Sequence, residues 1–587
     1  MKSNENYREG MKSLTANRRF APPLSFLRWA VCSLVLALAA MPLHAQFTFT
    51  DWYDFDSATG SMPFNYGTLA VGSDARLYGT TYYGGTHNQG VLFATTTLGV
   101  YAPLFDFGGL NGGAPLGGLT VFHDLSTNPP QDYFYGVTTA GGKNDLGTVF
   151  RYNATTGIYK VLHSFTATEN DADDGAFAEA PPVFAADGNL YGVTGLGRIF
   201  SIKRPNDSYH LLSGSAGGTV TAPLSPVTEY SPTDTDLWGV SIDGGQNGYG
   251  SVFKVTILPA GMAGTVTTVY SFTGGNDGAY PGGPLTIDAG GTLYGTASAA
   301  GLNGNGVIFT IGVNSPYTFS NPPLYTFDAG FHNTDGSWPV AGLTPAGGNL
   351  YLGANEGGGT YGNGTLFDVT STGTFTPLFE LQEGLPPSGD PTTTLIQFGD
   401  GNFYGLMSGG PGTPGAGTFY SLNPPNPYRN ITWCCNTNLI LDQPVMILGL
   451  GLEGAVQVTF GGAQAQFQPG SDTYLIADVP SEALDGPLAV VLATGEQVQS
   501  VQSAHILPTI LNLDPSSGPV GTTVVIAGGG FAGTTMVKFG STQATNFTVL
   551  SPALIQVVVP EGAKTGKVEV TTPNGTALSP ENFKVIK

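Results

Sequence analysis

The sequence predicts an all-β protein in which a seven-bladed β-propeller is followed by two immunoglobulin-like β-sandwiches. Three observations lead to this prediction. A unit of about 54 residues recurs seven times, each unit holds four short runs of β-forming residues, and alternating apolar runs continue to the C-terminus. No stretch of the mature sequence shows a convincing helical period.

Residues 1–45 have the features of a secretory signal peptide. Basic residues precede an apolar run from Trp29 to Ala40, and Ala45 closes a stretch suited to signal peptidase. We expect cleavage after Ala45, export from a bacterial-type cell, and a secreted or cell-surface protein. No later segment has about 18 consecutive apolar residues, so no membrane insertion is expected after cleavage.

The mature sequence is strongly acidic. Without residues 1–45 it has 14 Lys and Arg against 40 Asp and Glu, a net charge of −26. Such a surface repels phosphate backbones and anionic lipids, which argues against nucleic acid and acidic membranes as partners. Only Cys434 and Cys435 remain, so no disulfide framework is expected and their oxidation state stays open. A monomer is expected.

The repeat is marked by an apolar–aromatic–Gly step, followed in most units by Gly-x-x-aromatic. The aromatic residue of the step recurs at Tyr78, Tyr135, Tyr191, Trp238, Tyr294, Tyr351 and Tyr404. In the second unit, residues 118–122, 133–138, 148–152 and 159–165 are predicted strands, here called a to d. Gly, Asn and Asp separate them, as in antiparallel turns. Four antiparallel strands are typical of one propeller blade.

The two ends of the repeat region favour a closed ring over an open solenoid. The seventh unit ends at Pro424-Pro425 without a strand d, and Phe49–Phe55 at the mature N-terminus resembles the missing strand. Pairing of this segment with the seventh unit would remove the exposed sheet edges of an open array. We therefore predict a propeller over residues 46–425.

The patterns LYGTT, GG, GTVF, SF and DGxxP resemble the choice-of-anchor tandem repeats called GloVer, over about residues 46–425. The unit also resembles the Kelch blade. The resemblance implies export and repetition more than any activity. From Pro515-Ser516-Ser517-Gly518-Pro519 onward, residues 506–587 resemble the IPT/TIG fold, an immunoglobulin-like domain of surface receptors, adhesins and some enzymes. Residues 428–505 are predicted to form a second, degenerate module of the same kind.

No catalytic centre is evident from the sequence. The six mature histidines lack metal-ligand spacing, arginines are few, and most acids lie in turns where Asp caps its own backbone. The acidic loop Asn170–Gly175 suggests calcium but lacks the EF-hand spacing, so a solvated turn is favoured. No metal, cofactor or catalytic residue is predicted, although two acids from different blades could meet over a central channel.

Three functions are open. We favour a secreted or surface binding or adhesion protein whose propeller face engages a glycan or a surface protein. The alternatives are an extracellular propeller enzyme, a polysaccharide hydrolase or lyase, and a structural envelope component. Propellers host both binding and catalysis. Binding is favoured because no repeat was seen to carry dense polar substitutions.

The predicted ligand-binding residues are aromatic and lie in the loops at one end of the blades. In an up-and-down sheet the b–c and d–a connections leave the same end, so all of them share one face. Aromatic rings stack on the apolar C–H surfaces of neutral sugars. The candidates are Tyr82, Tyr83, Tyr249 and Tyr361 in b–c loops, and Tyr280 and Trp338 in d–a loops. Phe177, Tyr280 and Trp338 share one position in the repeat, so their alternative role is to pack between neighbouring blades rather than to bind a ligand. The b–c loop tyrosines are therefore the preferred ligand-binding residues.

Overall fold

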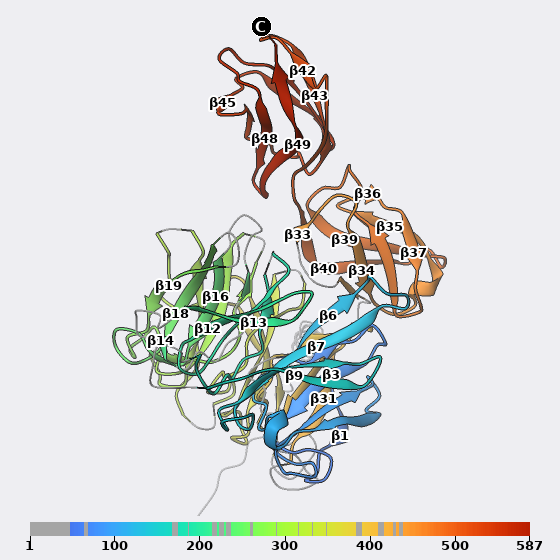
Figure 1. Cartoon of the computed structure of the whole chain (residues 1–587). Coiled ribbons are helices and arrows are strands. Elements are labelled where there is room, and N and C mark those ends of the chain that lie inside the picture. Colours follow the sequence, from blue (N-terminus) through green and yellow to red (C-terminus); the bar gives the residue numbers. More distant parts are fainter. Residues whose placement is uncertain are drawn as a thin grey trace, which may run out of the picture. The chain divides into compact units, whose positions relative to one another are not determined.

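The computed structural model describes residues 47–63, 68–166, 174–185, 187–213, 220–221, 228–229, 236–258, 262–288, 290–314, 316–330, 333–347, 349–382, 390–408, 416–425, 430–433 and 438–586. These residues form an all-β structure (Figure 1) with two short 3-10 turns, η1 (Gly109–Asn111) and η2 (Leu452–Gly454). No helix among them could cross a membrane. The predicted signal peptide, residues 170–173, Cys434 and Cys435 lie outside the described residues.

The repeat region forms seven small antiparallel sheets, which we number in chain order. Sheets one to three consist of β2 (Ala70–Val71), β3 (Leu77–Thr81), β4 (Val91–Thr95) and β5 (Tyr101–Asp106); β6 (Thr120–Asp124), β7 (Gln131–Thr138), β8 (Thr148–Asn153) and β9 (Ile158–Ser164); and β10 (Val183–Phe184), β11 (Leu190–Val193), β12 (Ile199–Lys203) and β13 (Ser208–Ser213). In sheet two the observed strands begin and end within two residues of the predicted ones.

The later sheets follow the same order of strands. Sheets four to seven consist of β15 (Thr228–Glu229), β16 (Asp236–Ser241), β18 (Ser251–Leu258) and β19 (Met262–Ser271); β20 (Ala279–Pro281), β21 (Thr286–Ile287), β22 (Thr292–Ala299), β23 (Val307–Gly312) and β24 (Tyr325–Thr326); β25 (Thr344–Pro345), β26 (Leu350–Asn355), β27 (Thr365–Thr370) and β28 (Phe375–Glu380); and β29 (Ile396–Gln397), β30 (Phe403–Met407), β31 (Thr418–Asn423) and β1 (Thr48–Asp54). Beside sheet four, β14 (Val220–Thr221) pairs with β17 (Asp243–Gly244).

The two sequence signatures of the repeat meet across strands b and c. Gly136 of β7 lies opposite Phe150 of β8 in the register, and Gly79 lies opposite Phe93 in the same way. A Cβ on Gly136 would lie only 2.5 Å from the ring of Phe150. Glycine therefore ends the aromatic step because the ring from strand c occupies the space that a side chain would need.

Hydrophobic clusters join each sheet to the next. One cluster contains Tyr78 of sheet one and Phe134 of sheet two, whose ring centroids are 4.0 Å apart. Corresponding clusters join sheets two to three, three to four, four to five, five to six and six to seven. Each fully buried large apolar side chain stabilises such a contact by roughly 1.5–3 kcal/mol.

Sheet seven also packs against sheet one. β1 pairs antiparallel with β31, and the two strands lie side by side in Figure 1. One cluster contains Phe55, Leu69, Leu77 and Phe93 together with Phe398, Tyr404, Leu406 and Phe419. Thr68 forms an isolated parallel bridge with Thr394. The first and last repeats therefore share both backbone hydrogen bonds and a core.

The C-terminal part contains two further hydrophobic cores. One lies within residues 431–506, among strands β32 (Asn430–Trp433), β33 (Asn438–Leu439), β34 (Pro444–Leu448), β35 (Ala455–Phe460), β36 (Ala463–Gln464), β37 (Phe467–Pro469), β38 (Tyr474–Asp478), β39 (Gly486–Leu492) and β40 (Gln497–Ile506).

The other core lies within residues 510–583, between two sheets. Along β43, β47 and β48 of these sheets buried and more exposed residues alternate, as in a sandwich strand with one face in the core. The strands are β41 (Thr509–Asp514), β42 (Ser517–Gly518), β43 (Thr523–Gly529), β44 (Met536–Phe539), β45 (Thr542–Gln543), β46 (Phe547–Ser551), β47 (Leu554–Val558), β48 (Gly566–Thr572) and β49 (Gly575–Val585).

Candidate functional site

The exposed aromatic side chains of the described residues gather in two classes of loop. There are six of them, each 38–51% exposed, and every one lies in a b–c or a d–a connection, with Tyr280 in the short strand β20 inside its connection. They are Tyr83, Phe177, Tyr249, Tyr280, Trp338 and Tyr361. Five of the six predicted ligand-binding residues are in this set, and the sixth, Tyr82, is partly buried. Phe177 was not among the predicted binding residues.

The d–a loop aromatics have an unusual backbone conformation. Phe177, Tyr280 and Trp338 have φ angles of 55°, 57° and 58°. Bulky residues rarely adopt this left-handed region, and holding one there costs about 1 kcal/mol or more. Met62 and Ala114 occupy the same place in their loops, with φ angles of 50° and 52°. Because Ala114 takes the same conformation, the turn itself does not require an aromatic ring.

The backbone of these residues joins neighbouring sheets. The N–H of Tyr280 donates to the Tyr249 carbonyl at 2.9 Å, and the N–H of Trp338 donates to the Asn305 carbonyl at 3.0 Å. Phe177 and Ala114 donate in the same way to the preceding b–c loops, and Met62 donates to Ala416 of the last repeat at 2.7 Å. The backbone therefore serves the repeat, as the wedge alternative supposed, whereas the rings stay about 40% exposed.

A proline marks the point where the sheets touch. A Cβ on Gly250 would lie 2.5 Å from Cδ of Pro281, which follows Tyr280, and a Cβ on Gly306 would lie 2.7 Å from Cδ of Pro339. Proline, and not the aromatic residue before it, occupies the space against the preceding sheet. The aromatic side chains stay about 40% exposed, and the Trp338 ring lies against Gly357.

Two ring pairs lie in this set of loops. Tyr82 and Tyr83 meet edge to face with centroids 4.5 Å apart, and burial, with the neighbouring Tyr83, raises the pKa of the Tyr82 hydroxyl. Tyr249 and Tyr280, from different sheets, have centroids 6.1 Å apart at 59°. The second pair places a b–c loop aromatic beside a d–a loop aromatic, so the two classes of loop form a common surface there.

Carboxylates with raised pKa values lie in the same loops, and no sequence motif marks them. Burial, with the nearby charge of Asp243, raises the pKa of Glu179 to about 7. Burial also raises the pKa of Glu356, to which Asp390 adds, and that of Asp390 itself. Each pair joins acids from different repeats that are more than 30 residues apart in the chain. With a pKa of about 7, Glu179 is partly protonated at neutral pH, as a general acid is.

Other titratable groups are tied into the fold. His123 contacts Asp132 at 2.5 Å inside the protein, and His163 contacts Asp174 beneath a stacked Tyr209 ring. Asp74, Asp288 and Asp400, in the turns before strand b, accept hydrogen bonds from the tyrosine of that strand. Among the described residues, no three His, Cys, Asp or Glu side chains are grouped so as to hold a metal.

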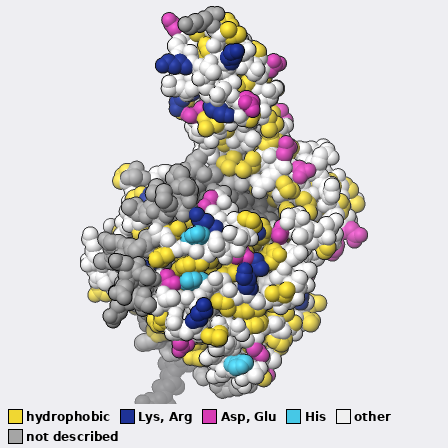
Figure 2. All heavy atoms as spheres, viewed as in Figure 1, with side chains coloured by type: hydrophobic (Ala, Val, Ile, Leu, Met, Phe, Trp, Pro, Cys, Tyr) yellow, Lys and Arg dark blue, Asp and Glu magenta, His cyan; other side chains and the backbone are white. Residues whose placement is uncertain are grey.

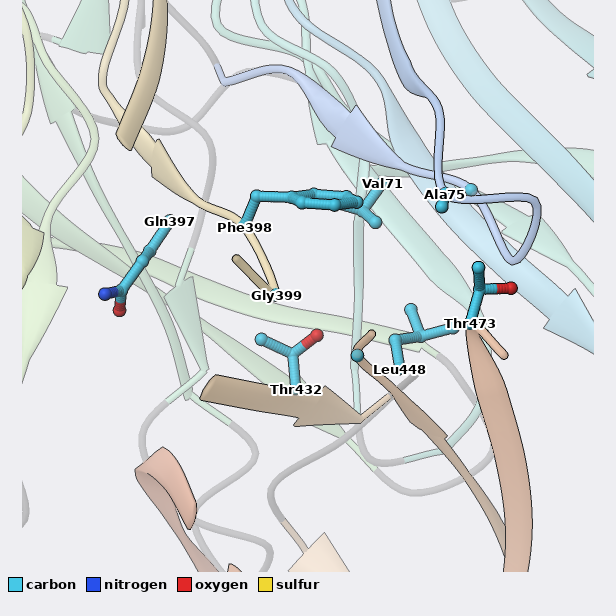
Figure 3. Close-up of a pocket in the computed structure, with 10 residues that line it drawn as sticks. Val71, Ala75, Gln397, Phe398, Gly399, Thr432, Leu448 and Thr473 are labelled. Carbon is cyan, nitrogen blue, oxygen red and sulfur yellow. The ribbon is translucent and has the colours of Figure 1, made fainter. Parts of the chain in front are cut away.

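A small pocket lies away from these loops (Figure 3). Val71, Ala75 and Phe398 line it, together with Leu448 and Thr473, whose hydroxyl donates to the Ser73 carbonyl at 2.7 Å. No titratable side chain lines it. On the face in view in Figure 2, acidic and basic side chains are scattered without a continuous patch of either sign.

Comparison with known proteins identifies two of the parts. Residues 41–197 match the model of the Gloeobacter/Verrucomicrobia repeat, and residues 508–585 match that of the IPT/TIG domain. No curated protein matches the chain.

Solved structures give weaker likenesses. The surface glycan-binding protein PbSGBP-B from Prevotella bryantii is 18% identical over 26% of this chain and 41% of its own, with a TM-score of 0.19. SGBP-B from Bacteroides uniformis, from a xyloglucan utilization locus, is 16% identical over 27% and 49%, with a TM-score of 0.15. A puromycin-hydrolyzing peptidase from Mycobacterium tuberculosis is 12% identical over 69% and 62%, with a TM-score of 0.37.

The chain thus spans less than half of the length of both glycan-binding proteins. With TM-scores this low, none of the three likenesses carries an argument about function. The two family models agree with the resemblances seen in the sequence. The chain therefore carries Gloeobacter/Verrucomicrobia repeats on its N-terminal side and an IPT/TIG domain at residues 508–585.

Proposed function

We propose that this protein is an exported glycan-binding protein whose seven sheets form a closed seven-bladed β-propeller. Closure is supported by the pairing of β1 with β31 and by the core shared between sheets seven and one. In such a ring the b–c and d–a loops of all blades lie on one face. We propose that this face is the binding surface, and that residues 430–506 form a second immunoglobulin-like module before the IPT/TIG domain.

One observation carries the proposal: all six exposed aromatic side chains of the described residues lie in these loops. Exposed apolar side chains that gather in one region mark interaction sites more often than singly scattered ones do. Phe177, Tyr280 and Trp338 are held there in a backbone conformation that smaller residues adopt more easily. A surface that presents rings at this conformational cost is suited to stacking on a ligand.

The ligand class follows from charge and shape. The net charge of −26 in the mature protein disfavours anionic polymers. Rings spread over several sheets suit an extended ligand better than a small molecule in a deep pocket. Asn, Gln and Asp groups in the same loops can bind hydroxyls. These features together favour a neutral polysaccharide.

The test is binding of the purified mature protein to an array of neutral and acidic polysaccharides. Replacing Tyr83, Tyr249 and Tyr361 by Ala should weaken binding at least about tenfold, since stacked aromatic contacts are worth about 0.5–1.5 kcal/mol each. The melting temperature should change little. Unchanged binding would place the site elsewhere, and a loss of folding would show these tyrosines to be packing residues.

An enzymatic function is favoured by one observation, the raised pKa of Glu179 beside Asp243. A protonated carboxyl near a second acid is the arrangement used by glycoside hydrolases. Release of reducing ends from a bound polysaccharide, lost in Glu179→Gln, would support it. Binding without turnover would favour the binding protein.

A further inference from the structure

Three d–a loops contain a paired acid and hydroxyl. In each, one carboxylate oxygen accepts a hydrogen bond from a threonine hydroxyl of the same loop. The pairs are Asp56 with Thr59, Asp174 with Thr166, and Asp277 with Thr273. In each pair a neutral hydroxyl donor satisfies the charged carboxylate.

The loop before sheet six departs from this rule. Thr166 and Thr273 directly follow the last Phe of strand d, and at the same place after Phe327 the chain has Asp328. Asp335 takes the place of Asp174 and Asp277. This loop therefore has two carboxylates where the others have an acid and a hydroxyl.

The buried carboxylate of Asp335 is only half satisfied. Its Oδ2 accepts hydrogen bonds from the Asp328 N–H at 2.8 Å and from the Tyr325 hydroxyl at 2.9 Å. Its Oδ1, where Asp277 binds a hydroxyl, has no hydrogen-bond partner among the described residues, and Asp335 is only 4% exposed. Burial raises the pKa of Asp335, and the charge of Asp328 adds to the rise.

Other side-chain oxygens of this region are also buried without a partner among the described residues. They are Asn333 Oδ1, Ser337 Oγ and Asn355 Oδ1. Asn333 is held in the loop because its Nδ2 donates to the carbonyls of Asp328 and Gly336, at 2.8 and 2.7 Å. Asn355 donates to the Asp335 carbonyl at 2.9 Å. An unpaired buried oxygen is destabilising until a water, a proton or a cation satisfies it.

We propose that Asp328 and Asp335, together with Asn333, bind a calcium ion in the loop that leads to Trp338. Carboxylate and amide oxygens are the ligands that calcium prefers, and it accepts irregular coordination. Asp328 is exposed, and its charge raises the pKa of the buried Asp335; a divalent cation bound by both carboxylates would remove this repulsion. The site lies in one of the d–a loops of the proposed glycan surface, but calcium binding there does not depend on glycan binding. A proton shared between the two acids is the competing explanation.

The test uses the mature protein after treatment with EDTA, titrated with calcium chloride at neutral pH by calorimetry. The wild type should show one saturable site. Asp328→Thr restores the acid–hydroxyl pair of the other loops, so it should fold normally and weaken calcium binding at least about tenfold. Asp335→Asn should do the same.

Asp277→Asn is the matched control, because it alters the corresponding acid in the loop before sheet five. Its calcium affinity should equal that of the wild type. Absence of saturable calcium binding by the wild type would overturn the proposal in favour of the shared proton. Unchanged affinity in Asp328→Thr would also overturn it, even if Asp335→Asn failed to fold.

Discussion

Closure of the seven sheets into a ring can be tested through a single contact between the first and last repeats. A Cβ on Gly417 would press against Cδ of Pro63 and lie 2.7 Å from the Met407 carbonyl. Gly417 has a φ of 102°, which any side chain finds strained. Gly417→Ala should therefore cost about 1–2 kcal/mol from the backbone and about 1–3 kcal/mol from overpacking.

Two other glycines distinguish the cost of backbone strain from the cost of overpacking. Gly250 has a φ of 92°, and its Cβ would meet Pro281 at 2.5 Å, so Gly250→Ala should cost as much as Gly417→Ala. Gly304 has a φ of 87° with nothing within 4 Å of a Cβ, so Gly304→Ala should cost only about 1–2 kcal/mol. The measurement is the free energy of unfolding in urea, followed by tyrosine and tryptophan fluorescence.

A double-mutant cycle with Pro63→Ala isolates the contact itself. If the repeats meet there, Pro63→Ala should relieve part of the cost of Gly417→Ala, with a coupling of about 1 kcal/mol or more. If Gly417→Ala costs no more than Gly304→Ala and shows no coupling to Pro63, the first and last repeats do not touch and the closed ring is refuted.

Three further predictions concern other parts of the protein. Because the pKa of Glu179 is raised to about 7, the folded state loses stability as pH rises through this value. Glu179→Gln should therefore raise the melting temperature above pH 7 and leave it nearly unchanged near pH 4. Melting curves of the two proteins that differ equally at all pH values would contradict this prediction. Residues 506–587 have their own core, so the isolated fragment should unfold cooperatively when followed by circular dichroism. A gradual transition would count against an independent domain. Deletion of residues 47–55 exposes the edge of β31 and removes Phe55 from its cluster. We therefore expect the shortened protein to aggregate, as seen by size-exclusion chromatography. A monomer with an unchanged melting temperature would contradict that expectation.

The sequence was most informative where the repeat itself is structural. The strands of sheet two lie within two residues of their predicted positions because Gly136 and Phe150 recur in nearly every unit and oppose each other in the register. The predicted aromatic surface depends on the up-and-down order of strands; Tyr83, Tyr249 and Tyr361 are exposed, and ligand binding by them stays a prediction.

Features that depend on distances between repeats could not be predicted. Glu179 and Asp243 are separated by more than 60 residues, and nothing in their local sequence indicates that their charges interact. The left-handed backbone of Phe177, Tyr280 and Trp338 runs against the preference of aromatic residues. The sequence predicts no repeat with dense polar substitutions, whereas Asp328 and Asn355 both donate to Asp335 in the loop before sheet six.

The central claim is that the aromatic loops form the binding surface, and a comparison of two variants tests it most directly. In the first, all six exposed rings are replaced by Ala. In the second, Leu98, Val100 and Ile158, exposed apolar residues at the c–d turns, are replaced by Ser. Calorimetric titration with the best neutral polysaccharide should show binding abolished in the first variant and unchanged in the second. Equal weakening in both, or retained binding in the first, would contradict the account.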